Sequence, residues 1–177
     1  MRRELFIHFS FWFSFFIFVT IARHYFDFLY WPIWLGGVVG MFLPDIDHIL
    51  YVLLLRPEEF TSQRFAFLLG KKETWRAVEV LYETRSERRG LIFHTVLFQL
   101  IFLVLTFWMV TSSGSIFGKG LALSFAMHLV VDQIVDLTET GNLDNWLKLS
   151  PIKLDLIQSK TYWVVMLGLV LLMGLFI

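Results

Sequence analysis

The chain has 177 residues, of which 57% are hydrophobic and 18% aromatic, and its formal net charge is zero. This composition is typical of membrane proteins rather than soluble domains, and the zero net charge argues against nucleic acid as a partner. The chain has no cysteine, which excludes a disulfide framework and a thiolate metal site. Any metal site must therefore use histidine and carboxylate ligands, which suit zinc, magnesium or manganese.

We expect an all-α fold, a single polytopic membrane domain over residues 1–177 with about five transmembrane helices of about 20 apolar residues each. The first apolar run follows two arginines, as in a signal peptide. Bulky Phe and Trp fill it and no small-residue cleavage site follows, so an uncleaved helix is predicted. The predicted spans are Leu5–Ala22, Tyr30–Leu55, Leu91–Val110, Ile116–Leu137 and Tyr162–Ile177.

Basic residues are unevenly distributed over the predicted loops. If the N-terminus is cytoplasmic, all but two of the 15 Lys and Arg residues lie in inner segments, and only Arg23 and Lys119 lie in outer ones. Because Lys and Arg favour cytoplasmic loops, we predict a cytoplasmic N-terminus and an outer C-terminus.

Two cytoplasmic loops are predicted, over residues 56–90 and 138–160. The second indicates turns with a short interfacial segment. The first predicts a helix that starts near Pro57 and ends at Gly70, because Pro is common in the first turn and Gly at the stop. A second helix, over Glu73–Glu83, could lie on the membrane surface or cap a cavity. Its predicted apolar face carries Trp75, Val78, Leu81 and Tyr82.

Three of the predicted spans carry ionisable residues near their cytoplasmic ends. Such residues cost about 3 kcal/mol each inside a membrane and tend to line interiors or functional sites. Counted at 1.5 Å per residue from neighbouring charges, they lie roughly 6–14 Å inside the membrane, in one layer of the cytoplasmic leaflet. We therefore predict a common His/Asp site formed by three helices. The candidate metal ligands are Asp45, Asp47, His48, His94, His128 and Asp132.

The fourth span places two of these candidates on one helix face. His128 and Asp132 are four positions apart, which puts both side chains on the same side. A buried His–Asp pair that joins two helices is the alternative explanation. We interpret Asp136, one turn further on, as an interfacial residue. We place His8 and His24 outside the site, with His8 as a structural residue of the first helix.

The second span contains the sequence LPDIDHIL at residues 43–50. Its acids and histidine cannot share one face of a regular helix unless Pro44 breaks the helix and a new one begins. Irregular backbone at this depth is tolerated where it borders protein or a watery cavity. Pro followed by acids also begins ordinary helices, so a plain helix N-terminus is the alternative. For His94, the alternative is a hydrogen-bonded core histidine.

Three segments, GMFLPDIDHIL, RRGLIFHTVLF and AMHLVVDQIVD, resemble in order the signature blocks of the YdjM-like inner-membrane proteins, a family described as membrane-bound metal-dependent hydrolases. The resemblance covers roughly residues 33–137. In the middle block, Arg88 stands where the family often has His, and His94 comes one residue later than expected. The first and third blocks match at Pro44, Asp45, Asp47, His48, His128 and Asp132. The resemblance implies a protein of the bacterial inner membrane that holds a divalent metal ion.

We therefore expect a membrane-embedded hydrolase with one or two divalent ions, zinc before magnesium or manganese, because a bound metal activates water near neutral pH. Asp45 or Asp47, where free of metal, would act as a general base. Arg88 and Arg89 would bind a phosphate or carboxylate of the substrate, with Arg89 in a catalytic role. For Arg88, the preference for basic residues on the cytoplasmic side is a sufficient alternative explanation.

The depth of the site suggests that membrane lipids, or another amphiphilic molecule that contains phosphate, supply the substrate. The alternative is a non-enzymatic membrane protein, either a metal or proton transporter or a metal-stabilised structural protein. The polar residues cluster in one leaflet, and stretches such as Leu103–Val110 offer no polar continuation across the membrane, which argues against transport.

Overall fold

The computed structural model describes residues 2–88, 90–148, 150 and 152–177, with the backbone alone at positions 2, 3 and 86. Over these residues the chain forms helices and no strand, which confirms the all-α prediction. Short 3-10 turns cover Phe28–Tyr30 and Arg85–Glu87, and a π-helical turn covers Tyr51–Leu55. The α-helices are α1 (Arg2–Arg23), α2 (Trp31–Phe42), α3 (Ile46–Leu50), α4 (Phe60–Gly70), α5 (Thr74–Glu83), α6 (Val96–Ser112), α7 (Ile116–Thr140) and α8 (Leu156–Met173).

Several helices have the length and composition of membrane spans. Among the described residues, four stretches are long and apolar enough to cross a membrane. The predicted span Leu91–Val110 is instead the shorter apolar helix α6 of 17 residues, because residues 91–95 are not helical. Helix α8 begins earlier than the predicted Tyr162, because Asp155 and Gln158 form a capping box that starts it at Leu156. The four long stretches are Glu4–Arg23, Phe28–Leu55, Ile116–Thr140 and Leu156–Met173.

The predicted break at Pro44 is confirmed. Helix α2 ends at Phe42 and α3 begins at Ile46. Pro44 has no N–H to donate and its ring clashes with the preceding turn, so the helical hydrogen-bond ladder cannot continue through it. Four-residue turns bridge the gap, with Ile46 N donating to Leu43 O at 3.1 Å and Asp47 N to Pro44 O at 3.0 Å.

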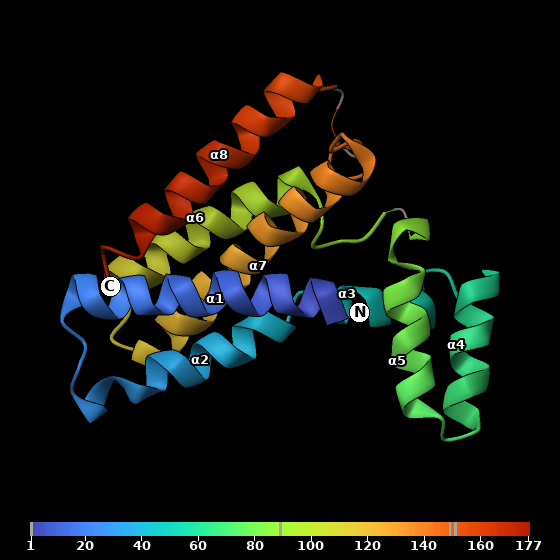
Figure 1. Ribbon diagram of the computed structural model, residues 1–177, viewed down its shortest axis with the longest axis horizontal. Helices are drawn as coiled ribbons and strands as arrows, with labels where there is room; N and C mark the ends of the chain where they lie inside the picture. Colours follow the sequence, from blue (N-terminus) through green and yellow to red (C-terminus); the bar gives the residue numbers. More distant parts are fainter. Residues whose placement is uncertain (1, 89, 149, 151) are drawn as a thin grey trace.

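Helix α7 is the centre of the bundle, with α1, α2, α6 and α8 around it (Figure 1). Helix α2 approaches it most closely, because glycines remove side chains from the contact. A Cβ atom at Gly36 or Gly40 would overlap the α7 backbone, and a Cβ at Gly120 would overlap the backbone of Ile33. The central position of α7 explains why polar residues on it are buried.

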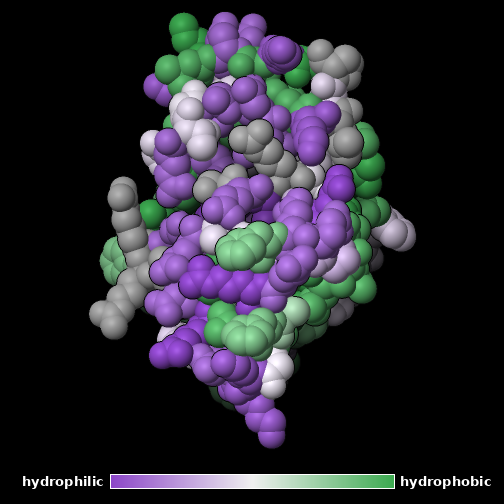
Figure 2. Space-filling view, turned by 90° about the vertical axis from the view of Figure 1, so that its right-hand side faces the viewer, coloured by the Kyte–Doolittle hydropathy of each residue, from purple (hydrophilic) through white to green (hydrophobic). Residues whose placement is uncertain are grey.

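Helices α4 and α5 form a hairpin at one end of the bundle, the end at which α1 begins (Figure 1). The C-terminus lies at the opposite end, where Arg23 Nη1 donates to Leu175 O at 3.2 Å. Viewed onto the hairpin end, the surface is largely hydrophilic (Figure 2). This polarity suits the end of a membrane bundle that projects into water.

The predicted helices of the first loop are present, with two differences. Helix α4 ends at Gly70 as predicted but starts at Phe60, after the turn that contains Pro57. Of the face predicted for α5, Leu81 is buried, but Trp75 is 68% exposed. The buried face is completed by Ala77 and Val80, because α4 packs against that side of α5.

Candidate metal centre

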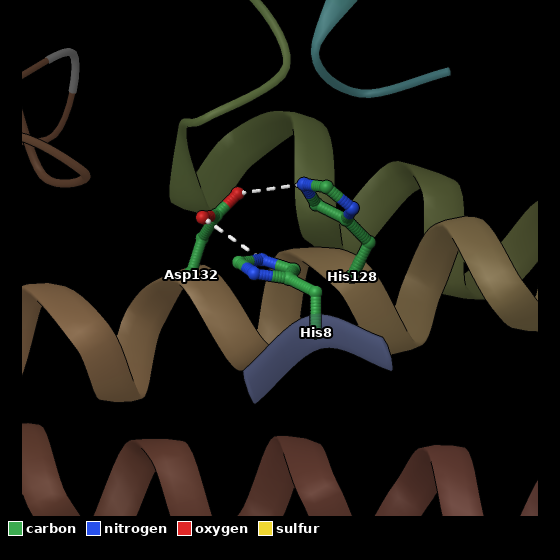
Figure 3. Close-up of side chains that lie close together, drawn as sticks. All are labelled: His8, His128 and Asp132. Carbon is green, nitrogen blue, oxygen red and sulfur yellow. Dashed lines mark ion pairs between the residues drawn. The ribbon is translucent and has the colours of Figure 1, made fainter. Parts of the chain in front are cut away.

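Two histidines and one aspartate meet inside the hairpin end of the bundle. His128 and Asp132 lie one turn apart on α7, and His8 reaches them from α1 (Figure 3). All three are buried, and one potential ligand atom of each lies within 4.8 Å of the others. His8, His128 and Asp132 are called the metal centre below.

The hydrogen bonds of the two histidines fix which ring nitrogen faces the carboxylate. His8 Nδ1 lies 3.0 Å from Glu4 O, and His128 Nδ1 lies 2.5 Å from Met41 O. A carbonyl oxygen only accepts, so each Nδ1 carries the hydrogen, and in the neutral ring Nε2 then presents a lone pair. Metal-binding histidines commonly donate their other ring N–H to a carbonyl in this way.

Both Nε2 atoms point at Asp132. The distance from His8 Nε2 to Asp132 Oδ1 is 3.3 Å, and that from His128 Nε2 to Asp132 Oδ2 is 3.1 Å (Figure 3). Neither Nε2 makes a well-directed hydrogen bond with any residue that the structure describes. Two buried lone pairs beside a buried carboxylate are the donor set of a divalent metal site, so the residues fit a metal ion.

His94 joins this group from the segment before α6. Its Nε2 lies 2.9 Å from Asp132 Oδ2, and its Nδ1 lies 3.1 Å from Asp47 Oδ2. Asp47 is fully buried and also accepts backbone N–H groups, from Ile92 at 3.1 Å and Phe93 at 2.6 Å. Asp47 thus fixes the position of the His94 ring and of the backbone at Ile92 and Phe93, which precede it in the sequence.

The remaining candidates lie around the centre rather than inside it. Asp45 Oδ1 is 3.8 Å from His128 Nε2, and the Asp45 side chain is 34% exposed. The ring of His48 lies 5.1 Å from that of His94, and its Nδ1 accepts a hydrogen bond of 2.9 Å from Arg88 Nε. Arg89, predicted to be catalytic, lies outside the described residues.

An arginine that the sequence did not single out contacts the centre. Arg85 Nη2 lies 3.1 Å from Asp132 Oδ1 and 3.3 Å from Asp136 Oδ1, and Arg85 Nη1 lies 3.7 Å from Glu4 Oε2. Burial lowers the pKa of Arg85, but Asp132 and Asp136 raise it more, so the net pKa is above the ordinary value. Burial, and then repulsion from Arg85, lower the pKa of Arg88 to about 10. Both arginines are therefore charged at neutral pH.

The structure corrects the interpretation of His8. Its expected place outside the site is wrong, because α1 packs against α7 and brings the His8 ring to within 4.4 Å of the His128 ring, centroid to centroid. The depth rule applied to the other candidates would have included it, since His8 lies roughly 8 Å from Arg3 at 1.5 Å per residue. The surrounding aromatic residues concealed this signal.

Comparison of the chain with protein-family models, with curated proteins and with solved structures finds no match. The chemistry of the centre therefore follows from its own geometry. Of the six predicted ligands, the structure brings His94, His128 and Asp132 into contact, with Asp47 behind His94 and with Asp45 and His48 beside them.

Proposed function

We propose that this protein is a membrane-embedded, divalent-metal-dependent hydrolase of the YdjM-like kind. The observation that carries the proposal is the convergence of two unpartnered histidine Nε2 atoms on one buried carboxylate. Two histidines and one carboxylate form the protein ligand set of several catalytic zinc sites, which keep a further position open for water or substrate. His94, whose Nε2 lies beside the same carboxylate, is the fourth candidate ligand.

The charges around the centre support a bound cation. Both ring nitrogens of His94 face carboxylate oxygens, so His94 is a cation in the metal-free protein. With the other histidines neutral, five carboxylates face this imidazolium and two guanidinium groups, an excess of two negative charges in a largely buried network. Unpaired buried charge is costly, and a divalent cation would offset much of the excess. The acids are Glu4, Asp45, Asp47, Asp132 and Asp136, and the bases are Arg85 and Arg88.

Asp45 and Asp47 differ in exposure and in their hydrogen-bond partners, so we assign them different roles. A divalent ion, when bound, would supply Lewis acidity and activate water. Asp45 is close to His128 and partly exposed, so we assign it the role of general base. Both oxygens of Asp47 are engaged by backbone N–H groups and His94, so we assign it an orienting role in place of the catalytic role suggested by the sequence.

We place the centre in the cytoplasmic leaflet of a bacterial inner membrane. The uneven distribution of basic residues supports a cytoplasmic N-terminus, and the hydrophilic hairpin end lies on that side of the bundle (Figure 2). Zinc is the metal we expect first, because histidine nitrogens with one carboxylate suit it, and magnesium or manganese would need more oxygen ligands.

Metal analysis of the purified protein tests the proposal. We expect about one divalent ion per wild-type chain, little in His128→Ala, and a wild-type amount in His24→Ala, which removes an exposed histidine at the other end of α1. If wild type and His128→Ala carry equally little zinc, magnesium, manganese and iron, the metal centre does not exist.

Hydrolysis assays then separate an enzyme from a metal-stabilised structural protein. The second candidate is favoured by one observation: His94 bridges Asp47 and Asp132, and so ties together the second span, the start of α6, and α7. We expect a panel of phosphomonoesters and phospholipids to contain a substrate whose hydrolysis is lost in Asp45→Asn with metal retained. Metal that is present and stabilising, without hydrolysis of any panel member, would favour the structural role.

A further inference from the structure

A second cavity, of about 180 Å³, lies beside the metal centre, between the broken second span and α5. It shares four wall residues with the smaller hollow that contains the metal centre, namely Phe42, Asp45, Tyr82 and Arg85. A molecule held in this cavity would therefore lie against the centre, with only these side chains between.

The lining of the cavity combines charged and apolar side chains. Two guanidinium groups and one carboxylate lie in the lining. Arg85 is already paired with Asp132 and Asp136, so Arg88, which has no carboxylate partner among the described residues, is the cation available to a ligand. Guanidinium groups match the planar oxygen pairs of phosphate and carboxylate. The charged residues are Asp45, Arg85 and Arg88, and the apolar ones are Phe42, Ile49, Val78 and Leu81.

Arg88 retains N–H groups for a ligand. Among the described residues it donates to His48 Nδ1, to Thr84 Oγ1 at 3.1 Å and to the carbonyl oxygen of Leu81. A guanidinium has five N–H groups, so two remain after these three bonds. The three bonds hold the group in place at the cavity wall, which reduces the entropy lost when a ligand binds.

The cavity is too small for a whole lipid, since pockets for drug-sized ligands measure about 300–1,000 Å³. Its rim is apolar and open, with Phe42 52% and Ile49 40% exposed. Both belong to the stretch Phe28–Leu55 that is apolar enough to cross a membrane. A ligand whose polar head occupies the cavity could thus extend an apolar tail along this surface into the membrane.

Helix α5 runs across the end of the spanning helices (Figure 1). Val78 and Tyr82 of α5 line the cavity, and Trp75, one turn earlier, is 68% exposed. Lys72 and Arg76 are its near neighbours in the sequence. Exposed Trp beside basic residues is typical of the headgroup level of a membrane, which places the cavity mouth at that level.

We propose that this cavity is a lateral binding site for a membrane lipid with a phosphate headgroup. The phosphate lies at Arg88, on the wall that Arg85 also lines, and the acyl chains leave past Phe42 and Ile49. The proposal deepens the proposed function and rests on it for the bond that is hydrolysed. Lipid binding and metal content are separate measurements on the same samples, so the two proposals can fail independently.

Photo-crosslinking from the cavity wall provides the test. The chain with Val78→p-benzoylphenylalanine is placed in phosphatidylcholine nanodiscs that contain a minor share of either phosphatidate or diacylglycerol, irradiated, and analysed by mass spectrometry. We expect phosphatidate adducts several-fold above its share of the bilayer, and no enrichment of diacylglycerol, which lacks the phosphate. Glu79→p-benzoylphenylalanine, at the next and exposed position of α5, is the matched control and should show no enrichment.

The proposal would be overturned if the lipid adducts at position 78 followed the bulk lipid composition, or if phosphatidate adducts were equally enriched at position 79. It would also be overturned if soluble glycerol 3-phosphate, at the same concentration as phosphatidate, abolished the phosphatidate adducts. Adding Ile49→Trp, which fills the cavity from its rim, should reduce the enrichment several-fold, and unchanged enrichment would also count against it. Zinc content of the same samples separates the two proposals. Metal without enrichment removes the lipid site alone, and enrichment without metal removes the metal centre alone.

Discussion

Asp47 Oδ2 lies 3.1 Å from His94 Nδ1, although the two residues are 47 positions apart in the sequence. The contact requires the break at Pro44, which sets the start of α3, and the non-helical backbone of residues 90–95, which presents the N–H groups of Ile92 and Phe93 to the same carboxylate. His94 is thereby turned with its Nε2 toward Asp132. Asp47 of α3 therefore orients the ring of His94, which lies just before α6, toward Asp132 of α7.

Replacing Asp47 with Asn should weaken metal binding without removing a ligand of the metal centre. An amide is a poorer partner for the His94 N–H than a carboxylate, and loss of such an orienting group typically lowers metal affinity about 10–100-fold. Zinc titration by calorimetry, on wild type and on the exposed control Asp144→Asn, measures the change. Wild-type affinity in Asp47→Asn would mean that His94 takes no part in the metal site.

Replacing His8 with Phe separates its ligand role from its packing role. The ring of His8 is buried against that of His128, and Phe preserves an aromatic ring there while removing the Nε2 lone pair. We expect the variant to fold, as judged by a single peak in size-exclusion chromatography, and to contain much less metal than wild type. A folded His8→Phe protein with a full complement of metal would leave His8 as a packing residue.

Replacing Arg85 with Gln should act in opposite directions on the metal-free and metal-bound protein. Arg85 is the guanidinium that pairs with Asp132 and Asp136, so its loss leaves buried carboxylates unpaired and should destabilise the metal-free protein by about 3 kcal/mol. The same loss removes the charge that repels a divalent ion from Asp132, so zinc affinity should rise several-fold. Thermal unfolding in detergent with and without zinc measures both changes, with Arg76→Gln, at an exposed ion pair, as the control.

The sequence could predict the parts of this molecule that follow from apolar composition and local chemistry. Among the described residues, hydropathy located four stretches long enough to cross a membrane, but the third predicted span, Leu91–Val110, is helical only from Val96. The cost of ionisable residues in apolar surroundings identified His94, His128 and Asp132 as partners. The interruption between α2 and α3 also followed from local chemistry, because Pro44 has no N–H to donate and its ring clashes with the preceding turn.

What the sequence could not predict depends on the packing of helices against one another. The contribution of His8 depends on which face of α1 meets α7, and an aromatic-rich helix has no clear polar face to indicate it. The pairing of Arg85 with Asp132 depends on where the turn after α5 is placed. The division of roles between Asp45 and Asp47 depends on backbone N–H groups that come from a different segment.

The close approach of α2 and α7 predicts opposite effects for the same substitution at two helical glycines. Replacing Gly with Ala inside a helix favours the helix by up to about 1 kcal/mol, and Gly168, with open space around it, should show this gain. Gly40→Ala would bring the same gain in helix propensity, but its new methyl group would overlap the backbone of Leu121, so α2 and α7 must separate.

His128 Nδ1 contacts Met41 O, one residue along α2, so the separation should also disturb the metal centre. We expect Gly40→Ala to lower both the unfolding temperature and the zinc affinity. We expect Gly168→Ala to raise the unfolding temperature and to leave the zinc affinity unchanged. Equal unfolding temperatures for the two variants would show that the α2–α7 contact does not depend on glycine at this position.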